Sequence, residues 1–167
     1  MLTRDDFKKL RVLIVEDHAT TRDLICEILH HMGIRAIQTA EDGILGIHQL
    51  KQRVPDVILL DWRMDRMSGL EFSHWVRNHP ESPDPEMPIV MVSAHTSTDS
   101  VHEAVSVGVT EVVTKPVSPM TLRQKISRSL GLRPLRADLE RKEAPEAPQP
   151  PIESRDQADQ ADEVWEI

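Results

Sequence analysis

The feature that most constrains the fold is a short, unbroken apolar run, Val57-Ile58-Leu59-Leu60, that ends directly in an acid, Asp61. A continuous run of branched apolar residues is typical of a strand that is buried on both faces, as in a parallel sheet. In open α/β sheets, ligands bind outside the carboxyl ends of the strands, which is where this acid would stand. On this stretch alone, Asp61 is equally compatible with the first residue of an ordinary loop.

The alternation of apolar runs and helical patterns continues along the chain. Strands are expected at 11–17, 34–40, 55–61, 89–93 and 110–116, where each range includes the polar residues that end the strand. Helices are expected to begin near His18, Asp42, Leu70, Thr96 and Ser118. Strands that alternate with helices indicate parallel strands joined by right-handed crossovers, with helices on both faces. The sequence therefore predicts an α/β protein built as a doubly wound (βα)5 sheet.

The last part of the chain differs in composition from the rest. With 167 residues, the chain is long enough for one domain with a real core, which we place at residues 1–131. Residues 132–167 form a predicted tail, with a short helix at 134–143 and then a disordered, acidic, proline-rich segment, because too few of its side chains are apolar. Trp165 and Ile167 are exceptions: they are expected either to dock on a partner or on the domain, or to belong to an inert solubilising tail.

Composition argues against several classes of protein. The net charge of −8 and the sequence pI of about 5.4 argue against a general nucleic-acid-binding surface. The single cysteine, Cys26, excludes an internal disulfide, and the eight histidines show no metal-ligand spacing, so we expect no histidine metal site. No apolar run approaches the ~20 residues that span a bilayer, and residues 1–10 lack a secretory apolar segment. We expect a cytoplasmic protein with no membrane partner.

The polar residues that end the predicted strands form a candidate site. Parallel strands bring their carboxyl ends to one edge of the sheet, which would gather Glu16, Asp17, Asp61, Ser93 and Lys115. Carboxylates this close repel one another unless a cation lies among them, and carboxylate oxygens are ligands that Mg²⁺ prefers. Lysine binds phosphate as a point charge, and serine can donate to a phosphoryl oxygen. The set predicts that Asp61 accepts a phosphoryl group, with Mg²⁺ held by Asp17 and Asp61 and assisted by Glu16.

Four separated motifs resemble those of the receiver domain of two-component response regulators, over about residues 10–131. They are Glu16-Asp17, Asp61 with Met64, Met67 and Gly69 after it, Ser93-Ala94, and Lys115-Pro116. The resemblance implies a flavodoxin-like sheet of order 2-1-3-4-5 and a phosphohistidine donor, either a histidine kinase or a histidine phosphotransferase. It also implies that the backbone carbonyl of Arg63 binds Mg²⁺. On phosphorylation, a change is expected at the face made by the fourth helix, the fifth strand and the fifth helix of the (βα)5 pattern.

The sequence departs from the family's usual pattern at two positions. Asp65 follows Met64 where the family usually has proline, which adds an acid near the site. Val112 stands where the family usually has an aromatic switch residue, so the relay must use other packing or be weak. Arg63 and His95 match the positions that tune phosphoryl lifetime in the family. Arg63 is expected to shield the phosphoryl group or to pair with Asp65, or else simply to face solvent.

Three functions are compatible with these residues. The leading one is a non-enzymatic phosphoacceptor that controls the binding of a protein partner, without a DNA-binding output domain, because residues 132–167 are too few and too acidic for one. A phosphorylation-independent, receiver-like interaction protein is the alternative that Val112 and Asp65 leave open. An aspartyl-phosphate phosphohydrolase is a weaker one, because such enzymes commonly carry a second acid where this chain has Arg63.

Overall fold

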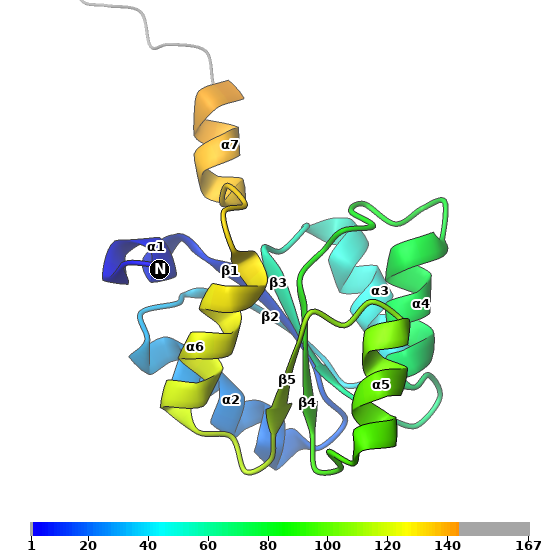
Figure 1. Cartoon of the computed structure of the whole chain (residues 1–167). Coiled ribbons are helices and arrows are strands. Elements are labelled where there is room, and N and C mark those ends of the chain that lie inside the picture. Colours follow the sequence, from blue (N-terminus) through cyan, green and yellow to red (C-terminus); the bar gives the residue numbers. More distant parts are fainter. Residues whose placement is uncertain (1, 144–167) are drawn as a thin grey trace, which may run out of the picture.

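The structure, a computed structural model, describes residues 2–143 of the chain (Figure 1). Trp165 and Ile167, together with the segment expected to be disordered, lie outside the described residues. The domain boundary at residue 131 therefore stays a prediction. Within residues 2–143, no helix is both long and apolar enough to cross a membrane.

Five parallel strands form one sheet, and the predicted order 2-1-3-4-5 is confirmed. The strands are β1 (Arg11–Val15), β2 (Ala36–Ala40), β3 (Val57–Asp61), β4 (Ile89–Ser93) and β5 (Glu111–Thr114). The central position of β3, between β1 and β4, explains why its sequence is apolar without alternation: all five of its residues are buried. The register pairs Val15 with Leu60 and Asp61 with Val92, so neighbouring strands end close to one another.

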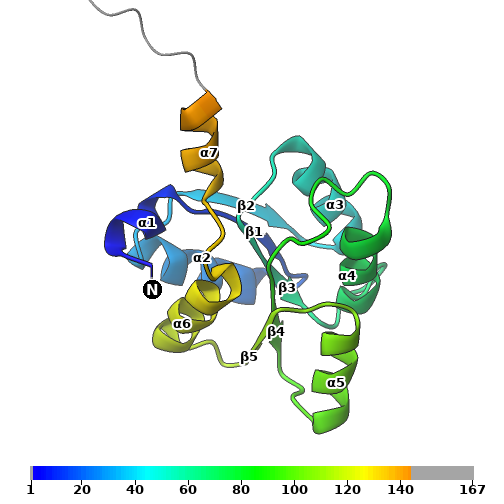
Figure 2. The ribbon, with the colours of Figure 1, turned by 45° about the horizontal axis from the view of Figure 1, so that its top comes forward.

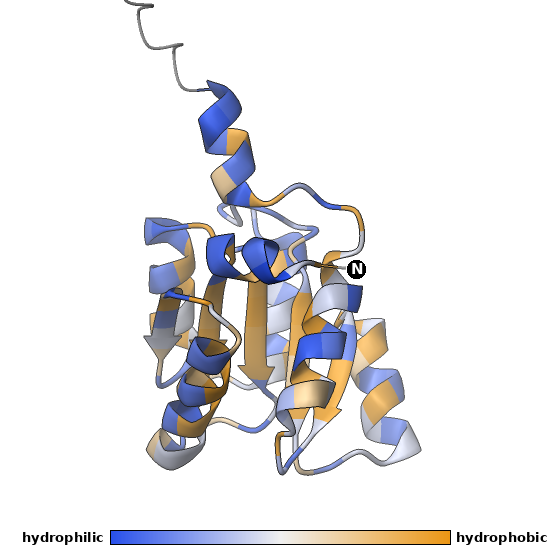
Figure 3. Cartoon of the chain, turned by 90° about the vertical axis from the view of Figure 1, so that its left-hand side faces the viewer, coloured by the Kyte–Doolittle hydropathy of each residue, from blue (hydrophilic) through white to orange (hydrophobic). Residues whose placement is uncertain are grey.

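Helices cover both faces of the sheet, as the alternating pattern predicted (Figure 1). One face carries α2 (Ala19–His31) and α6 (Pro119–Leu130), and the other carries α3 (Gly43–Gln52), α4 (Gly69–Asn78) and α5 (Thr98–Ser106). Successive strand residues point to opposite faces: in β1, Val12 and Ile14 join one apolar cluster, whereas Leu13 and Val15 join the other. Figure 3 shows the result as apolar strands behind helices whose outer surfaces are polar. Burying each such side chain contributes roughly 1.5–3 kcal/mol.

Two short helices extend the predicted pattern at the amino ends of the strands. They are α1 (Arg4–Lys9), which the sequence analysis did not anticipate, and α7 (Arg136–Glu143), which begins two residues after the expected start of the helix at 134–143. Figure 2 shows both helices at the same end of the sheet, away from the loops that follow the strands. Buried Phe7 of α1 joins the core, and so does Leu135, which directly precedes α7. Residues 133–135 are irregular, so the helix begins at Arg136.

Asp56 joins the first residues of β1 and α7. This buried carboxylate accepts the backbone N–H of Arg11 at 2.8 Å and the backbone N–H of Arg136 at 2.7 Å. Burial raises the pKa of Asp56, although the N–H groups of Arg136 and Arg11 oppose the shift. Side-chain pairs surround it: Arg11 binds both carboxylate oxygens of Glu140, and Arg136 binds Asp84. Residues 136–140 are thus pinned to the amino edge of the sheet.

Candidate functional site

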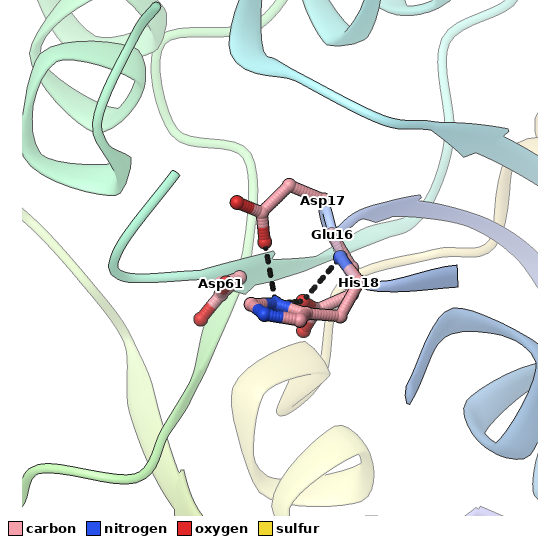
Figure 4. Close-up of side chains that lie close together, drawn as sticks. All are labelled: Glu16, Asp17, His18 and Asp61. Carbon is pink, nitrogen blue, oxygen red and sulfur yellow. Dashed lines mark hydrogen bonds and ion pairs between the residues drawn. The ribbon is translucent and has the colours of Figure 1, made fainter. Parts of the chain in front are cut away.

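The carboxyl edge of the sheet gathers the acids that the sequence singled out. Glu16 and Asp17 directly follow β1, and Asp61 is the last residue of β3. Ligand atoms from these three residues and from His18 all lie within 4.8 Å of one another (Figure 4). Glu16 and Asp61 are only 1% and 5% exposed. We call these four side chains the acidic cluster.

Gly69 allows the next helix to start against the end of β3. A Cβ atom at this position would lie 2.6 Å from the carbonyl oxygen of Asp61, too close for any side chain. Its N–H donates to the carbonyl oxygen of Trp62 at 3.0 Å. A capping box fixes the start of α4, because Ser68 and Glu71 each accept the backbone N–H of the other. The loop between Asp61 and α4 is therefore held at both ends.

Lys115, which follows β5, supplies one positive charge to the cluster. Its Nζ lies 2.9 Å from Glu16 Oε2 and 3.3 Å from Asp61 Oδ1. Burial lowers the pKa of Lys115, but the nearby carboxylates of Glu16 and Asp61 outweigh it and leave that pKa raised. One ammonium group thus faces two buried carboxylates, and Asp17 beside them adds a third acid. The ionised cluster carries more negative than positive charge.

The excess of carboxylates changes how Asp61 ionises. Burial raises the pKa of Asp61 to about 7, and the charge of Glu16 adds to the shift, whereas Lys115 opposes it. Burial also raises the pKa of Asp17, but the charge and the hydrogen bond of His18 outweigh it and leave that pKa below its ordinary value. A carboxylate with a raised pKa favours a bound cation, because a cation stabilises its charged form.

His18 is a member of the acidic cluster that the sequence analysis did not select. Its Nδ1 lies 2.9 Å from Asp17 Oδ1 and 3.4 Å from Glu16 Oε1. The charge of Asp17, together with hydrogen bonds to Asp17 and Glu16, raises the pKa of His18. The spacing rules for histidine ligands did not find it because its partners are carboxylates of its own sequence neighbours rather than other histidines. Its place directly after the Glu16-Asp17 pair was the available signal.

An open pocket of about 580 Å³ lies beside the cluster and would admit a reacting side chain. It is lined by Asp17, His18, Trp62, Arg63, Met64, Asp65, Ser68, Leu70 and Glu103. Arg63 and Asp65 are exposed at its surface, and within residues 2–143 no ion pair joins them. Of the three expectations for Arg63, pairing with Asp65 is thus absent from this conformation.

The Ser93 hydroxyl makes no hydrogen bond to the acidic cluster in the described conformation. The Ser93 hydroxyl donates to the carbonyl oxygen of His95 at 3.0 Å and accepts the N–H of His95 at 3.1 Å. The His95 side chain is exposed. Val112 is half-buried and packs against the cluster of apolar residues under α3, α4 and α5. The hydroxyl expected to bind phosphate is therefore engaged with its own loop.

Comparison with known proteins identifies relatives of the chain. A sequence model of the family described as "Response regulator receiver domain" matches residues 12–127. Chemotaxis protein CheY-3 of Vibrio cholerae is 29% identical over 121 residues, which are 72% of this chain and 92% of that protein. The phosphate regulon transcriptional regulatory protein PhoB of Escherichia coli is 34% identical over 116 residues, which are 70% of this chain but only 49% of PhoB.

Solved structures share the same fold. Chemotaxis protein CheY4 of Vibrio cholerae superposes with a TM-score of 0.66 at 31% identity, covering 72% of this chain and 98% of that one. The receiver domain of a sensor histidine kinase from Pseudomonas aeruginosa PAO1 superposes with a TM-score of 0.65 at 22% identity, covering 73% of this chain and 98% of that one. The latter structure contains a magnesium ion coordinated in its active site cleft.

Proposed function

The chain belongs to the response regulator receiver domain family of two-component signalling, and from that premise we propose that Asp61 accepts a phosphoryl group from a phosphohistidine of a histidine kinase or histidine phosphotransferase. The observation that carries the proposal is a buried carboxylate at the carboxyl end of the central strand, with the ammonium group of Lys115 3.3 Å away. Receiver domains are regulatory, so the outcome of the reaction is a change in binding to a protein target.

In the proposed reaction, Asp61 acts as the nucleophile. A carboxylate oxygen of Asp61 forms a bond to phosphorus while the bond from phosphorus to the donor's imidazole nitrogen breaks. The electron pair of that bond stays on the imidazole, which becomes an ordinary neutral histidine after proton exchange with water. Lys115 places a positive charge beside the transferred group, so the protein contributes positioning and charge neutralisation.

The donor set of the acidic cluster fits a divalent cation. Its ligand atoms lie within 4.8 Å of one another, and Glu16 Oε2 is buried without a hydrogen bond, although Lys115 Nζ lies 2.9 Å away. We assign Mg²⁺ to Asp17, Asp61 and the backbone carbonyl of Arg63, with Glu16 beside it. When bound, Mg²⁺ would neutralise charge on the phosphoryl oxygens and on Asp61.

We propose that Ser93 starts the response of the protein to phosphorylation. Its hydroxyl would leave the carbonyl oxygen of His95 and donate to a phosphoryl oxygen on Asp61, which would move the loop that leads into α5. The change would reach α5, β5 and α6, where we place the binding surface for a protein target. Because Val112 has no ring, the relay depends on this loop and on aliphatic packing. Arg63 and His95 are assigned to control of the phosphoryl lifetime.

Beryllofluoride, which mimics a phosphoryl group on a carboxylate, tests the proposal. Trp62 directly follows Asp61 and lines the pocket beside the acidic cluster, so its fluorescence should change when beryllofluoride and Mg²⁺ are added together. The Asp61→Asn variant, of nearly equal shape, should show no change. An unchanged spectrum in the wild type, or an equal change in both proteins, would refute the assignment of Asp61.

Val112 favours one second function, a receiver-like module that binds its partner without phosphorylation. If the chain is a module of this kind, three samples should capture the same proteins from a bacterial lysate. The samples are the wild type with beryllofluoride, the wild type without it, and Asp61→Asn. The proposed phosphoacceptor instead predicts at least one protein captured only by wild type with beryllofluoride. A phosphohydrolase remains the less supported reading, because exposed Arg63 occupies the position of its second acid.

A further inference from the structure

The imidazole of His18 lies against the carboxylates of the acidic cluster and does not cap the helix that it precedes. His18 occupies the N-cap position of α2, yet its side chain makes no capping hydrogen bond. Its backbone N–H donates to Glu16 Oε1 at 3.1 Å, which turns the residue back toward the strand end. Figure 4 shows the ring between the carboxylates of Asp17 and Glu16, on the side of Asp61. A ring nitrogen is thus presented where the carboxylate oxygens converge.

A simple surface ion pair accounts for only part of this arrangement. The ring is 73% exposed, and exposed ion pairs add little to stability. The carboxylate of Glu16 beneath the ring is 1% exposed, and its Oε2 has no hydrogen bond even though Lys115 Nζ lies 2.9 Å away. Lys115 is shared with Asp61, so this one ammonium group does not balance the charge of the buried carboxylates, and the excess is costly unless a further cation joins them. The cluster therefore offers one imidazole nitrogen together with carboxylate oxygens for the same ion.

From this juxtaposition we propose that His18 is a metal ligand and that it gives the acidic cluster a preference for first-row transition metals over Mg²⁺. Mg²⁺ takes oxygen ligands, whereas imidazole nitrogen suits Zn²⁺, Co²⁺, Ni²⁺ and Cu²⁺. The inference rests on the proposed function only in assigning a metal to Asp17 and Asp61. A transition-metal ion held in this way occupies the carboxylates that Mg²⁺ uses, so the two ions compete for the phosphorylation site.

The test uses Co²⁺ and Mg²⁺ as probes and Trp62 as the reporter. The chain has three tryptophans, Trp62, Trp75 and Trp165, so Trp75→Phe with Trp165→Phe leaves Trp62 alone beside the cluster. In this background of the full chain, the affinity for each ion is measured by quenching of Trp62, and Co²⁺ is also followed by its visible absorption spectrum, which reports nitrogen coordination. We expect His18→Asn to weaken Co²⁺ binding by about tenfold or more and Mg²⁺ binding by about twofold at most.

Two further variants separate ligation from other effects. His18→Asp replaces nitrogen with carboxylate oxygen, and it should restore or strengthen Mg²⁺ binding without restoring the Co²⁺ spectrum. His48→Asn, on the exposed side of α3 and outside the acidic cluster, should change neither affinity. The proposal is overturned if His18→Asn weakens both ions equally, if it weakens neither, or if His48→Asn has the same effect.

The outcomes also distinguish this inference from the proposed function. If Asp17→Asn and Asp61→Asn weaken Mg²⁺ binding but His18→Asn leaves Co²⁺ binding unchanged, only the proposed role of His18 is wrong. If Asp17→Asn and Asp61→Asn leave the binding of both ions unchanged, the metal site of the proposed function is wrong as well. His18 is exposed, so its variants should unfold at the wild-type temperature, and a thermal melt checks that they do.

Discussion

Two buried aspartates at opposite ends of one strand differ in the partners that surround them. Asp56 directly precedes β3 and Asp61 ends it, and each is 5% exposed. Asp56 accepts two backbone N–H groups, at 2.8 and 2.7 Å, which come from the first residues of β1 and α7. Asp61 faces another buried acid and shares the ammonium group of Lys115 with it. At equal burial, the amino edge is satisfied by fixed partners, whereas the carboxyl edge remains available for a cation or a phosphoryl group.

This difference shows which property of a buried acid identifies a reactive site. Burial alone raises the pKa of both residues, but at Asp56 two N–H donors oppose the shift, and at Asp61 the charge of Glu16 adds to it. A buried acid whose oxygens accept hydrogen bonds stabilises the fold. A buried acid that faces another negative charge costs stability, but it binds a cation or a reacting group more readily. Removing the charge of Asp56 should therefore lower the stability of the fold, whereas removing the charge of Asp61 should raise it.

The largest expected effect is at the amino edge. Asp56→Ala leaves the buried N–H groups of Arg11 and Arg136 without their acceptor and should lower the free energy of unfolding by about 3 kcal/mol. Urea denaturation measures the loss. Asp56→Asn keeps one carbonyl acceptor and should lose about half as much. Equal stability of Asp56→Ala and wild type would remove the basis of the comparison.

At the carboxyl edge, Asp61→Asn should increase stability in the absence of divalent metal, by on the order of 2 kcal/mol above pH 7. The folded state raises the pKa of Asp61 to about 7 from its ordinary value of 3.8. Between these values the unfolded chain has lost the proton that the folded chain keeps, so the wild type loses stability as the pH rises through this window. The gain in Asp61→Asn should therefore disappear below about pH 4. Urea denaturation in EDTA across this pH range measures it, and a constant gain would contradict the assigned ionisation.

Saturating the carboxyl edge with Mg²⁺ should stabilise the wild type by about 1.4 kcal/mol at ten times the dissociation constant. Asp61→Asn should gain much less, because it loses a proposed ligand. Asp56→Ala should gain as much as the wild type, since the two edges lie at opposite ends of β3 and share no partner. Thermal unfolding with and without Mg²⁺ provides the comparison. A smaller Mg²⁺ gain in Asp56→Ala would show that the edges are coupled.

The smallest effect is expected from the half-exposed pair between Lys9 of α1 and Asp138 of α7, whose atoms lie 3.1 Å apart. Lys9→Met should lower the free energy of unfolding by about 0.5 kcal/mol at most. A loss as large as that of Asp56→Ala would mean that the side-chain pairs, rather than the carboxylate of Asp56, hold α7 against the domain. Urea denaturation of the two variants side by side decides this.

The two edges also differ in how far the sequence predicts them. The order of the sheet is implied by the resemblance to the receiver domain. The cluster of Glu16, Asp17 and Asp61 follows from local signals, because each acid directly ends an apolar run or follows one. Helix α1 has six residues and one buried anchor, Phe7, which is too little to form a periodic pattern. The role of Asp56 depends on Arg136, a residue 80 positions away.

Two features of the candidate site could not be predicted from the sequence. The approach of His18 to the cluster depends on the turn after β1, which the backbone bond to Glu16 fixes. The engagement of the Ser93 hydroxyl with His95 reflects a loop conformation, which no motif specifies. Residue identities could place the site, whereas the orientation of these side chains required the structure.

Phosphoryl transfer from acetyl phosphate tests the central contrast most directly. Wild type, Asp61→Asn and Asp56→Asn are incubated with acetyl phosphate and Mg²⁺, and intact-protein mass spectrometry counts the phosphoryl groups bound. We predict one phosphoryl group on the wild type and on Asp56→Asn, and none on Asp61→Asn. A wild type that stays unmodified, or an Asp61→Asn variant that is modified like the wild type, would contradict the account.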